Sequence, residues 1–201
     1  MNWTRQHCFI TGTDTGVGKS VVSAWLVQRM DADYWKPVQS GMDGETDAQV
    51  IQRLARLDAQ RIHPSTHTLT QPLSPHEAAR RDGITLHLRD FFLPSTPNPL
   101  VVEGAGGLLV PLNPQAFMID LIVHLSLPAI LVARTTLGTI NHTLLSLAAL
   151  RQRHIPILGV ILNGPDNPAN REAIATYGHV DILAHIPPLN PLNADALSEI
   201  I

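Results

Sequence analysis

A glycine-rich segment, GTDTGVGKS at residues 12–20, contains the residues best suited to bind a phosphate. It follows an apolar run at 7–12 and opens an amphipathic run at 19–30, which predicts that it joins a strand to a helix. In that setting, backbone N–H groups and the positive end of the helix dipole bind phosphate oxygens. We expect Lys19 to reach the β- and γ-phosphates of a nucleotide and the Ser20 hydroxyl to bind Mg²⁺. The alternative is a glycine-rich turn with a solvated lysine.

Two acidic residues could complete a cation site next to this loop. Glu103 lies in a predicted buried strand at 99–107 and is followed by glycines that let the chain approach a ligand. Asp47 opens a predicted helix at 47–57. Together with Ser20, these residues would supply three oxygen ligands of the kind that Mg²⁺ prefers. The alternatives are a helix N-cap for Asp47, with Thr46 as the other candidate cap, and a hydrogen-bonded buried acid for Glu103.

A second lysine, Lys36, ends a predicted strand at 33–37, in the segment YWKPVQSG at residues 34–41. Ligands of parallel sheets bind where the strands end, so we expect its ammonium group near the transferred phosphate. Since Lys19 already serves the nucleotide, Lys36 indicates a second anionic group, on an acceptor whose pocket Ser40 would line. The pattern favours phosphoryl transfer to a bound acid over simple ATP hydrolysis.

Short apolar runs alternate with amphipathic runs along the whole chain. The strands that we expect are at 7–12, 33–37, 99–107, 128–134, 156–164 and 180–187. The helices that we expect are at 19–30, 47–57, 75–83, 86–93, 115–125, 139–153 and 168–178, with a loop at 58–75. Because the strands are apolar throughout rather than alternating, they predict an α/β fold with a mostly parallel sheet covered by helices on both faces. We expect a single domain over 1–201.

Composition sets limits on the possible functions. The 201 residues are 44% hydrophobic and 15% charged, which is typical of a globular chain. A formal net charge of −3 predicts no general attraction to nucleic acid or to an anionic membrane. Apolar runs fall short of the roughly 20 residues of a membrane span. Cys8 is the only cysteine, so no internal disulfide forms, and we expect a reducing, cytoplasmic setting.

With these residues in view, the chain resembles the dethiobiotin synthetases. The segments that carry the resemblance, in the family's order and spacing, are GTDTGVGKS (12–20), KPVQSG (36–41), TDA (46–48), LSPH (73–76), VVEGAGG (101–107), PAILVARTTLGTINHTLL (128–145) and GVILNG (159–164). The resemblance covers nearly the whole chain and implies a P-loop NTPase-like fold and a homodimer. It also implies that ATP, CO₂ and 7,8-diaminononanoate become dethiobiotin, ADP and phosphate, through a carbamate and a carbamic–phosphoric anhydride. This is the step before the last in biotin synthesis.

The resemblance also implies roles for individual residues. Lys19 and Lys36 would be catalytic, with Lys36 against the carbamate and the migrating phosphoryl group. The residues implied in binding ATP are Thr15, Gly16, Val17, Gly18, Lys19, Ser20, Val21, Asp47, Glu103, Gly104, Ala105, Gly106, Asn163, Gly164, Pro187, Pro188 and Leu189. Those implied in binding the acceptor are Thr15, Lys36, Ser40, Gly138, Thr139, Ile140 and Asn141, the last four from the neighbouring subunit. The ligands implied for Mg²⁺ are Ser20, Asp47 and Glu103.

Two other functions fit a phosphate-binding loop. A regulatory ATPase of the partitioning type would have a second lysine within the loop, but residues 13–17 contain none. A small-molecule kinase would leave a phosphorylated product, whereas the reaction implied by the resemblance releases free phosphate and requires CO₂.

Overall fold

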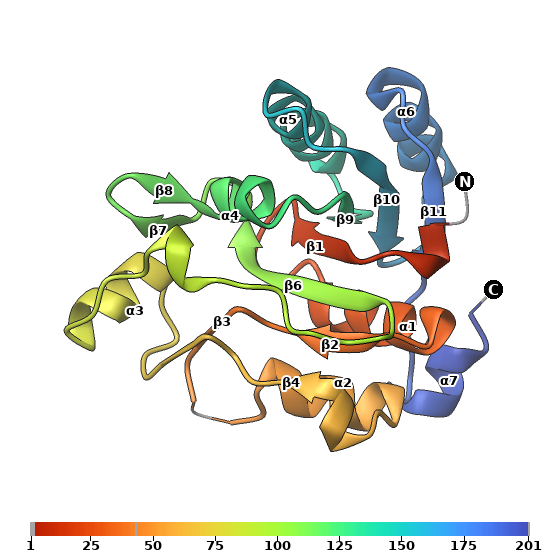
Figure 1. Cartoon of the computed structure of the whole chain (residues 1–201). Helices are drawn as coiled ribbons and strands as arrows, with labels where there is room; N and C mark the ends of the chain where they lie inside the picture. The colour runs from red at the N-terminus through yellow and green to blue at the C-terminus, as the bar shows by residue number, and fades with distance from the viewer. Residues whose placement is uncertain (1–2, 43, 201) are drawn as a thin grey trace.

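The computed structural model describes residues 3–42 and 44–200. At its centre lies a seven-stranded parallel sheet in the order β11-β10-β9-β1-β6-β2-β4 (Figure 1). Its strands are β1 (Cys8–Gly12), β2 (Asp33–Trp35), β4 (Ile62–His63), β6 (Leu100–Gly107), β9 (Ala129–Arg134), β10 (Ile157–Asn163) and β11 (Ile182–Ile186). The parallel sheet predicted from the apolar strands is confirmed.

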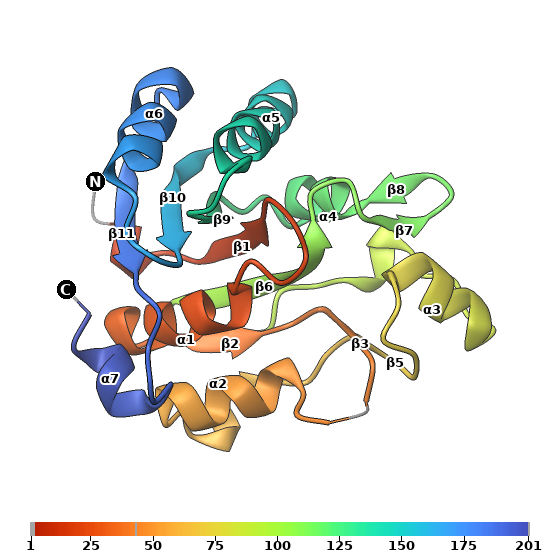
Figure 2. The same cartoon turned by 180° about the vertical axis from the view of Figure 1, so that it is seen from behind.

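Helices cover both faces of this sheet (Figure 2). One face carries α1 (Lys19–Met30), α2 (Asp47–Ala55) and α7 (Ala194–Ser198). The other carries α4 (Met118–Leu125), α5 (Thr139–Gln152) and α6 (Pro168–Gly178), with α3 (Pro75–Arg81) packed at its edge. None of the described helices is long and apolar enough to cross a membrane. The three-layer α/β architecture is the one that the sequence pattern predicts.

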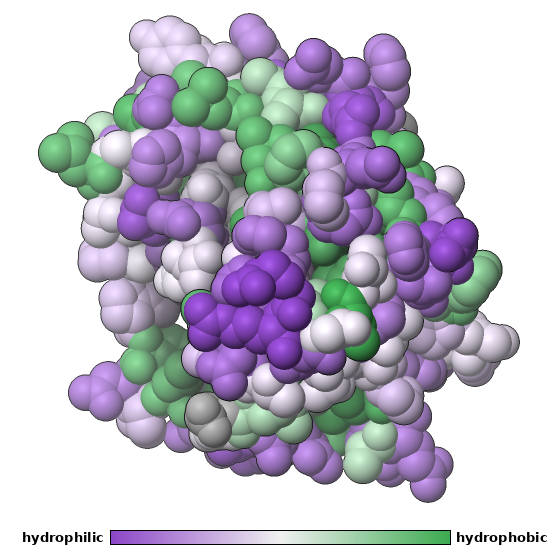
Figure 3. All heavy atoms as spheres, turned by 90° about the vertical axis from the view of Figure 1, so that its left-hand side faces the viewer, coloured by the Kyte–Doolittle hydropathy of each residue, from purple (hydrophilic) through white to green (hydrophobic). Residues whose placement is uncertain are grey.

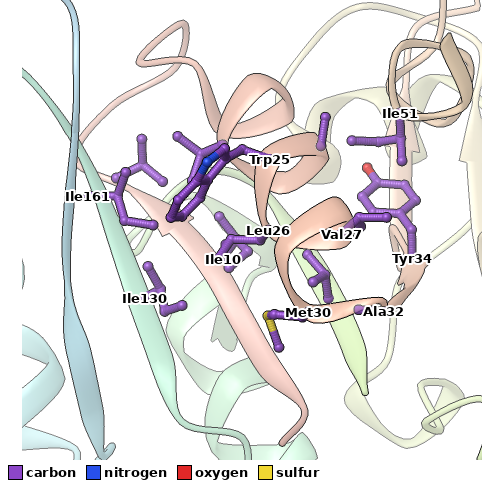
Figure 4. Packing of buried hydrophobic residues seen from close by; sticks show 14 of the residues in the cluster. Ile10, Trp25, Leu26, Val27, Met30, Ala32, Tyr34, Ile51, Ile130 and Ile161 are labelled. Atoms are coloured by element: carbon purple, nitrogen blue, oxygen red, sulfur yellow. The ribbon is translucent and has the colours of Figure 1, made fainter. Parts of the chain in front are cut away.

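The side chains of β1 divide between two hydrophobic cores because successive strand residues point to opposite faces. Ile10 packs with Trp25 and Leu26 of α1, on the face of the sheet that α1 covers (Figure 4). Phe9 packs on the other face with Leu121 of α4. All these side chains are at most 3% exposed, so β1 is held rigidly from both sides. The loop that follows β1 therefore starts from a well-defined position.

The first turn of α2 resolves which residue caps it. The Thr46 hydroxyl accepts a hydrogen bond from Gln49 N at 3.4 Å, and Gln49 Oε1 accepts one from Thr46 N at 2.8 Å. This reciprocal capping box satisfies two backbone donors at the helix start. Asp47 is consequently the first helical residue rather than the cap, and its carboxylate is available for other contacts.

The predicted loop at 58–75 is wrong in detail, because it contains regular structure. The segment holds a 3₁₀ turn (Ala59–Arg61), the edge strand β4, and β5 (His67–Leu69), which pairs in parallel with β3 (Val38–Ser40). Strands of two or three residues contain too few positions for a period of two to be recognised. They form here because a neighbouring strand supplies the hydrogen-bond partners.

The boundaries of two predicted helices also require correction. Residues 86–93 contain only a 3₁₀ turn (Leu88–Asp90), since the buried side chains Leu86 and Phe91 lie five positions apart rather than three or four. The helix expected at 115–125 begins at Met118, because its first residues belong to a hairpin of β7 (Pro111–Asn113) and β8 (Ala116–Phe117). Helix α7 follows the last strand and was not predicted.

A buried carboxylate at the start of β2 joins three parts of the chain. Asp33 Oδ1 accepts hydrogen bonds from Arg61 Nε and Asn98 Nδ2, both at 2.9 Å, and Oδ2 accepts one from Thr96 Oγ1 at 2.6 Å. His63 Nε2 lies 3.1 Å from Oδ2. Burial opposes the charge, but these hydrogen bonds outweigh it and lower the pKa of Asp33 to about 2. The ionised carboxylate thereby stabilises the strand that leads to Lys36.

We expect Asp33→Asn to destabilise the fold in a pH-dependent way. The folded pKa is depressed from 3.8, so the contribution is complete above about pH 4 and is lost as the pH falls toward about 2. A depression of this size corresponds to about 2 kcal/mol at neutral pH. Urea unfolding of both proteins between pH 7 and pH 2 measures the difference, and the exposed Asp181 provides the control substitution Asp181→Asn. A difference that does not shrink in acid would contradict this account.

Candidate active site

The loop between β1 and α1 has the backbone conformation of an anion-binding turn. Gly16 and Gly18 adopt left-handed φ angles of 75° and 91°. A Cβ atom on Gly18 would lie 2.1 Å from Nδ2 of Asn163, and residues other than glycine rarely adopt its left-handed φ, so the position favours glycine. Asn163 Nδ2 in turn donates to Val17 O at 3.0 Å. The loop is thus anchored to the end of β10, and the first turn of α1 supplies N–H groups that have no partner within the helix.

Lys19 and Lys36 are the only lysines of the chain, and both line the same cavity. Their exposed fractions are 8% and 7%, which is unusual for a residue type that normally lies in solvent. Lys19 Nζ donates to the backbone carbonyl of Asp14 at 3.3 Å. Burial lowers the pKa of Lys19, while the nearby Glu103 carboxylate partly offsets that effect. A buried ammonium group with one weak partner is suited to bind an anionic ligand.

Four side chains from four elements converge beside the loop. Lys36 Nζ lies 2.7 Å from Asp47 Oδ2 and 3.1 Å from Glu103 Oε1. The Ser20 hydroxyl lies 2.5 Å from Asp47 Oδ1 and 3.0 Å from Glu103 Oε1. These residues were expected at one edge of the sheet, and the structure brings them into direct contact. The pairing of Lys36 with both carboxylates was not predicted from the sequence.

The Lys36 ammonium group and the neighbouring carboxylates stabilise one another's charged forms. Burial disfavours the ammonium form of Lys36, but Glu103 and Asp47 outweigh it and raise the pKa of Lys36. For Asp47, burial opposes ionisation, and the Lys36 charge overcomes this and lowers the pKa of the carboxyl group. Both groups are therefore charged at neutral pH. The cluster is a preformed arrangement of one cation and two buried or half-buried carboxylates.

Tyr34 is a site residue that the sequence analysis missed. Its hydroxyl donates to Glu103 Oε2 at 3.1 Å, from a fully buried position. Burial, followed by the Glu103 charge, raises the pKa of Tyr34 well above its usual value, so the group remains a donor. Tyr34 lies in β2, which ends at Trp35 rather than at the predicted position 37, and Lys36 follows two positions after Tyr34. Both side chains contact Glu103, as residues two apart in extended backbone can because they point to the same side. That period of two was the signal that could have identified it.

A cavity of about 400 Å³ opens above the cluster. Every residue lining it belongs to the predicted site, and these residues are Thr15, Gly16, Gly18, Lys19, Ser20, Val21, Lys36, Ser40, Asp47, Glu103, Ala105 and Gly106. The Ser40 hydroxyl oxygen is buried and has no hydrogen-bond partner among the described residues. A bound ligand could supply that partner. Two further predicted residues, Val17 and Gly104, lie beneath the cavity and pack against the core.

The residues expected to bind the nucleotide base lie at the ends of β10 and β11. Gly164 N donates to Ile186 O at 2.9 Å, which joins the two strand ends next to Asn163. Pro187 and Pro188 follow and are exposed. Leu189 is half-buried and packs against the hydrophobic core that includes the buried side chains of α1. These residues lie outside the cavity above the cluster, on the Asn163 side of the loop.

The residues expected to bind the tail of the acceptor lie at the start of α5. Gly138 and Asn141 are exposed, whereas Thr139 is buried and its hydroxyl donates to Arg134 O at 2.5 Å. Ile140 packs partly against the core. None of the four lines the cavity above the cluster. Within one chain they therefore do not share this cavity with Lys36.

A second cavity of about 500 Å³ extends from the loop toward α5. Thr15 lines both cavities, so the two are neighbours at the phosphate-binding loop. The walls of the second cavity include Leu109 and Leu145, which are 65% and 62% exposed. Figure 3 shows the side of the molecule toward which β1 and β6 point, where hydrophobic and hydrophilic residues are interspersed.

The oxygen atoms of the cluster fit a magnesium ion that is bound together with a nucleotide. No group of three or more His, Cys, Asp or Glu side chains forms a metal site in the described part of the chain. The Ser20 hydroxyl nevertheless contacts one carboxylate oxygen of Asp47 and one of Glu103, which brings three oxygen atoms together. Mg²⁺ typically takes one or two carboxylates and completes its shell with phosphate oxygens and water. The donor set matches that usage.

The fold and the loop define a P-loop nucleotide-binding protein. The structure aligns with the MinC:MinD cell division protein complex of Aquifex aeolicus with a TM-score of 0.54 and 13% identity, covering 96% of this chain and 85% of that chain. At that identity the likeness concerns the fold alone. A family model described as an AAA domain matches residues 6–196.

Sequence comparison identifies the family within this class. The chain is 56% identical to an ATP-dependent dethiobiotin synthetase of Paramagnetospirillum magneticum, over 94% of this chain and 92% of the relative. It is 50% identical to the enzyme of the same name from Brucella ovis, over 94% of this chain and 89% of the relative. The chain belongs to the ATP-dependent dethiobiotin synthetase family.

Proposed function

We propose that this chain converts 7,8-diaminononanoate, CO₂ and ATP into dethiobiotin, ADP and phosphate. The names of its relatives and the motifs in its sequence point to this reaction. The observation that supports it best is the contact of Lys36 with Asp47 and Glu103 beside the phosphate-binding loop. A simple nucleotide-binding module has no use for a second buried lysine at that place. A cytoplasmic location, where ATP is available, is part of the proposal.

Two chemical steps follow carbamate formation. One amine of the acceptor adds to CO₂ and loses a proton, and the resulting carbamate oxygen attacks the γ-phosphorus of ATP. The bond to the bridging oxygen breaks and ADP leaves. The second amine then attacks the carbonyl carbon of the mixed anhydride and loses a proton, so that a C–N bond forms. The bond from that carbon to the phosphate oxygen breaks, and phosphate leaves. Both steps build up negative charge on oxygens close to the loop, where fixed positive groups are most effective.

Lys19 and Lys36 would stabilise different parts of this charge. Lys19, at the start of α1, is placed to contact the β- and γ-phosphates. Lys36 directly follows β2 and would approach the carbamate and the migrating phosphoryl group. The Ser40 hydroxyl, which lines the same cavity and lacks a partner, would contact the acceptor. Because these groups are already positioned, no reorganisation is needed during the reaction.

Ser20, Asp47 and Glu103 would hold Mg²⁺ together with the phosphates. The ion supplies charge shielding that permits an anionic carbamate to approach ATP. On the opposite side of the loop, Asn163 and the segment 187–189 would contact the adenine. Asn163 already binds the loop through Val17 O, which supports a position next to the nucleotide.

The reaction is tested by measuring phosphate release with ATP and Mg²⁺. We expect release only when both 7,8-diaminononanoate and bicarbonate are present, with dethiobiotin formed in equal amount. Omission of either should reduce the signal to background. Steady ATP hydrolysis without the acceptor would instead indicate a regulatory ATPase. A stable phosphorylated acceptor, detected by mass spectrometry, would indicate a small-molecule kinase.

We also propose a homodimer in which each active site takes residues 138–141 from the partner subunit. Within one chain these residues do not line the cavity that contains Lys36, and a second copy would be needed to bring such residues to it. The exposed side chains of Leu137, Leu109 and Leu145 provide apolar surface near the start of α5. Burying them against a second chain would stabilise the dimer.

Mixing two inactive variants tests the shared site. Lys36→Gln and Asn141→Ala should each be nearly inactive alone. After subunit exchange, about half of the dimers are mixed, and each mixed dimer has one intact site, so activity should recover to about a quarter of wild type. Mixing Lys36→Gln with Lys19→Ala is the control that should recover nothing, since both lysines line one cavity of one chain. Failure of the first mixture, with exchange confirmed by tags, would refute the shared site.

A further inference from the structure

An ion pair at the phosphate-binding loop has no role in the proposed phosphoryl transfer and ring closure. Asp14, within the loop, faces Arg134 at the end of β9. The two elements are neighbours, because β1 and β9 pair in parallel and Thr13 N donates to Val132 O at 3.0 Å. Both side chains are partly exposed, at 53% for Asp14 and 38% for Arg134.

In this structure the Asp14 carboxylate accepts a hydrogen bond from a backbone N–H group of the loop itself. Asp14 Oδ1 accepts a hydrogen bond from Thr15 N at 2.7 Å. Thr15 lines both cavities at the loop, so its N–H group lies close to the space that an anionic ligand would occupy. The carboxylate therefore competes with such a ligand for the N–H group, and its negative charge repels the ligand as well.

Arg134 offers the carboxylate another position. Its Nη2 lies 3.6 Å from Asp14 Oδ2, beyond a good hydrogen bond, and 3.3 Å from Nδ1 of His142. Its Nε is buried and has no hydrogen-bond partner among the described residues. Nε and Nη2 form the side of a guanidinium that binds a carboxylate with two parallel hydrogen bonds. One such donor is unused, and the other is only partly engaged.

We propose that Arg134 is a positioning residue that draws the Asp14 carboxylate away from Thr15 N and neutralises it when an anionic ligand enters the loop. The N–H group of Thr15 then becomes available to that ligand. The backbone carbonyl of Asp14 accepts a hydrogen bond from Lys19 Nζ. Movement of Asp14 would therefore also change the hydrogen bond that Lys19 makes. The inference rests on the proposed role of residues 12–20 in binding the nucleotide.

Binding of Mg·ATP without acceptor, measured by calorimetry, tests this proposal because no turnover occurs. We expect Arg134→Gln to weaken binding about five- to tenfold, the effect of one uncompensated charge near the phosphates at the edge of a protein. Arg134→Lys should recover part of the loss, since it restores the charge but not the two-pronged geometry. Arg56→Gln, which removes a similar surface ion pair with Asp195 far from the loop, is the matched control.

The decisive measurement is the double variant Asp14→Asn/Arg134→Gln. Asparagine carries no charge, and its amide oxygen accepts a weaker hydrogen bond from Thr15 N than a carboxylate does, so an anionic ligand should displace it without help from Arg134. Binding should return to within about twofold of wild type, a coupling that independent sites would not show. A double variant as weak as Arg134→Gln alone would overturn the proposal. So would an Asp14→Asn variant that raises the KM for 7,8-diaminononanoate while nucleotide binding is unchanged, because Asp14 would then contact the acceptor.

Lys19→Ala separates this proposal from the one on which it rests. If Lys19→Ala leaves Mg·ATP binding intact, the phosphate-binding role of the loop is wrong, whatever Arg134 does. If Lys19→Ala weakens binding and Arg134→Gln does not, only the role of Arg134 is refuted.

Discussion

Lys19→Ala is expected to abolish formation of dethiobiotin while the protein remains folded. Lys19 is the loop residue placed to contact the β- and γ-phosphates, and no other lysine besides Lys36 exists to replace it. Its side chain makes a single weak hydrogen bond, to Asp14 O. Burying an ammonium group with so little compensation does not favour folding, so its loss should not destabilise the protein. Turnover and the melting temperature of both proteins test this expectation.

The contradicting outcome is diamine-dependent turnover near the wild-type rate. It would show that the phosphates do not bind at residues 12–20. Loss of activity together with a large fall in melting temperature would be a folding defect and would require a second variant. Lys19→Met serves for that case, because it keeps most of the side-chain volume and removes only the charge.

Lys36→Gln is expected to slow the chemistry while leaving the affinity for ATP largely intact. Loss of one preorganised donor of this kind typically costs about 10²- to 10³-fold in rate. Single-turnover formation of dethiobiotin measures the rate, and calorimetry with Mg·ATP measures the affinity. If ATP affinity collapses instead, Lys36 is a nucleotide ligand, and the argument for a second anion is wrong.

The ion pairs of Lys36 require one additional control. Removing its charge leaves Asp47 and Glu103 uncompensated, which can destabilise the fold or disturb a cation site. The Mg²⁺ concentration needed for half-maximal activity separates these effects. An unchanged requirement, with a rate that remains low at saturating Mg²⁺, supports direct action on the reacting groups. A rate restored by excess Mg²⁺ would mean that Lys36 acts only by holding the carboxylates.

Local patterns in the sequence were sufficient for the α/β architecture and for placing Lys19, Ser20, Lys36 and Glu103 at one edge of the sheet. Apolar strands alternate with amphipathic helices, and this period depends only on neighbouring residues. The turn from β1 into α1 requires glycine at 18 and places Lys19 and Ser20 in the first turn of the helix. Because parallel strands end at one edge of the sheet, strand ends alone predicted that Lys36 and Glu103 would lie near this turn.

Contacts between distant residues were decided only by the tertiary structure. Ser20 and Glu103 are 83 positions apart, and Tyr34 and Glu103 are 69 apart. No local pattern specifies which of several strand-end groups will be close enough for a hydrogen bond. The pairing of Lys36 with both carboxylates and the position of Arg134 opposite Asp14 arise in the same way. They depend on the order of the strands in the sheet, and that order is set by packing of the whole chain rather than by any one segment.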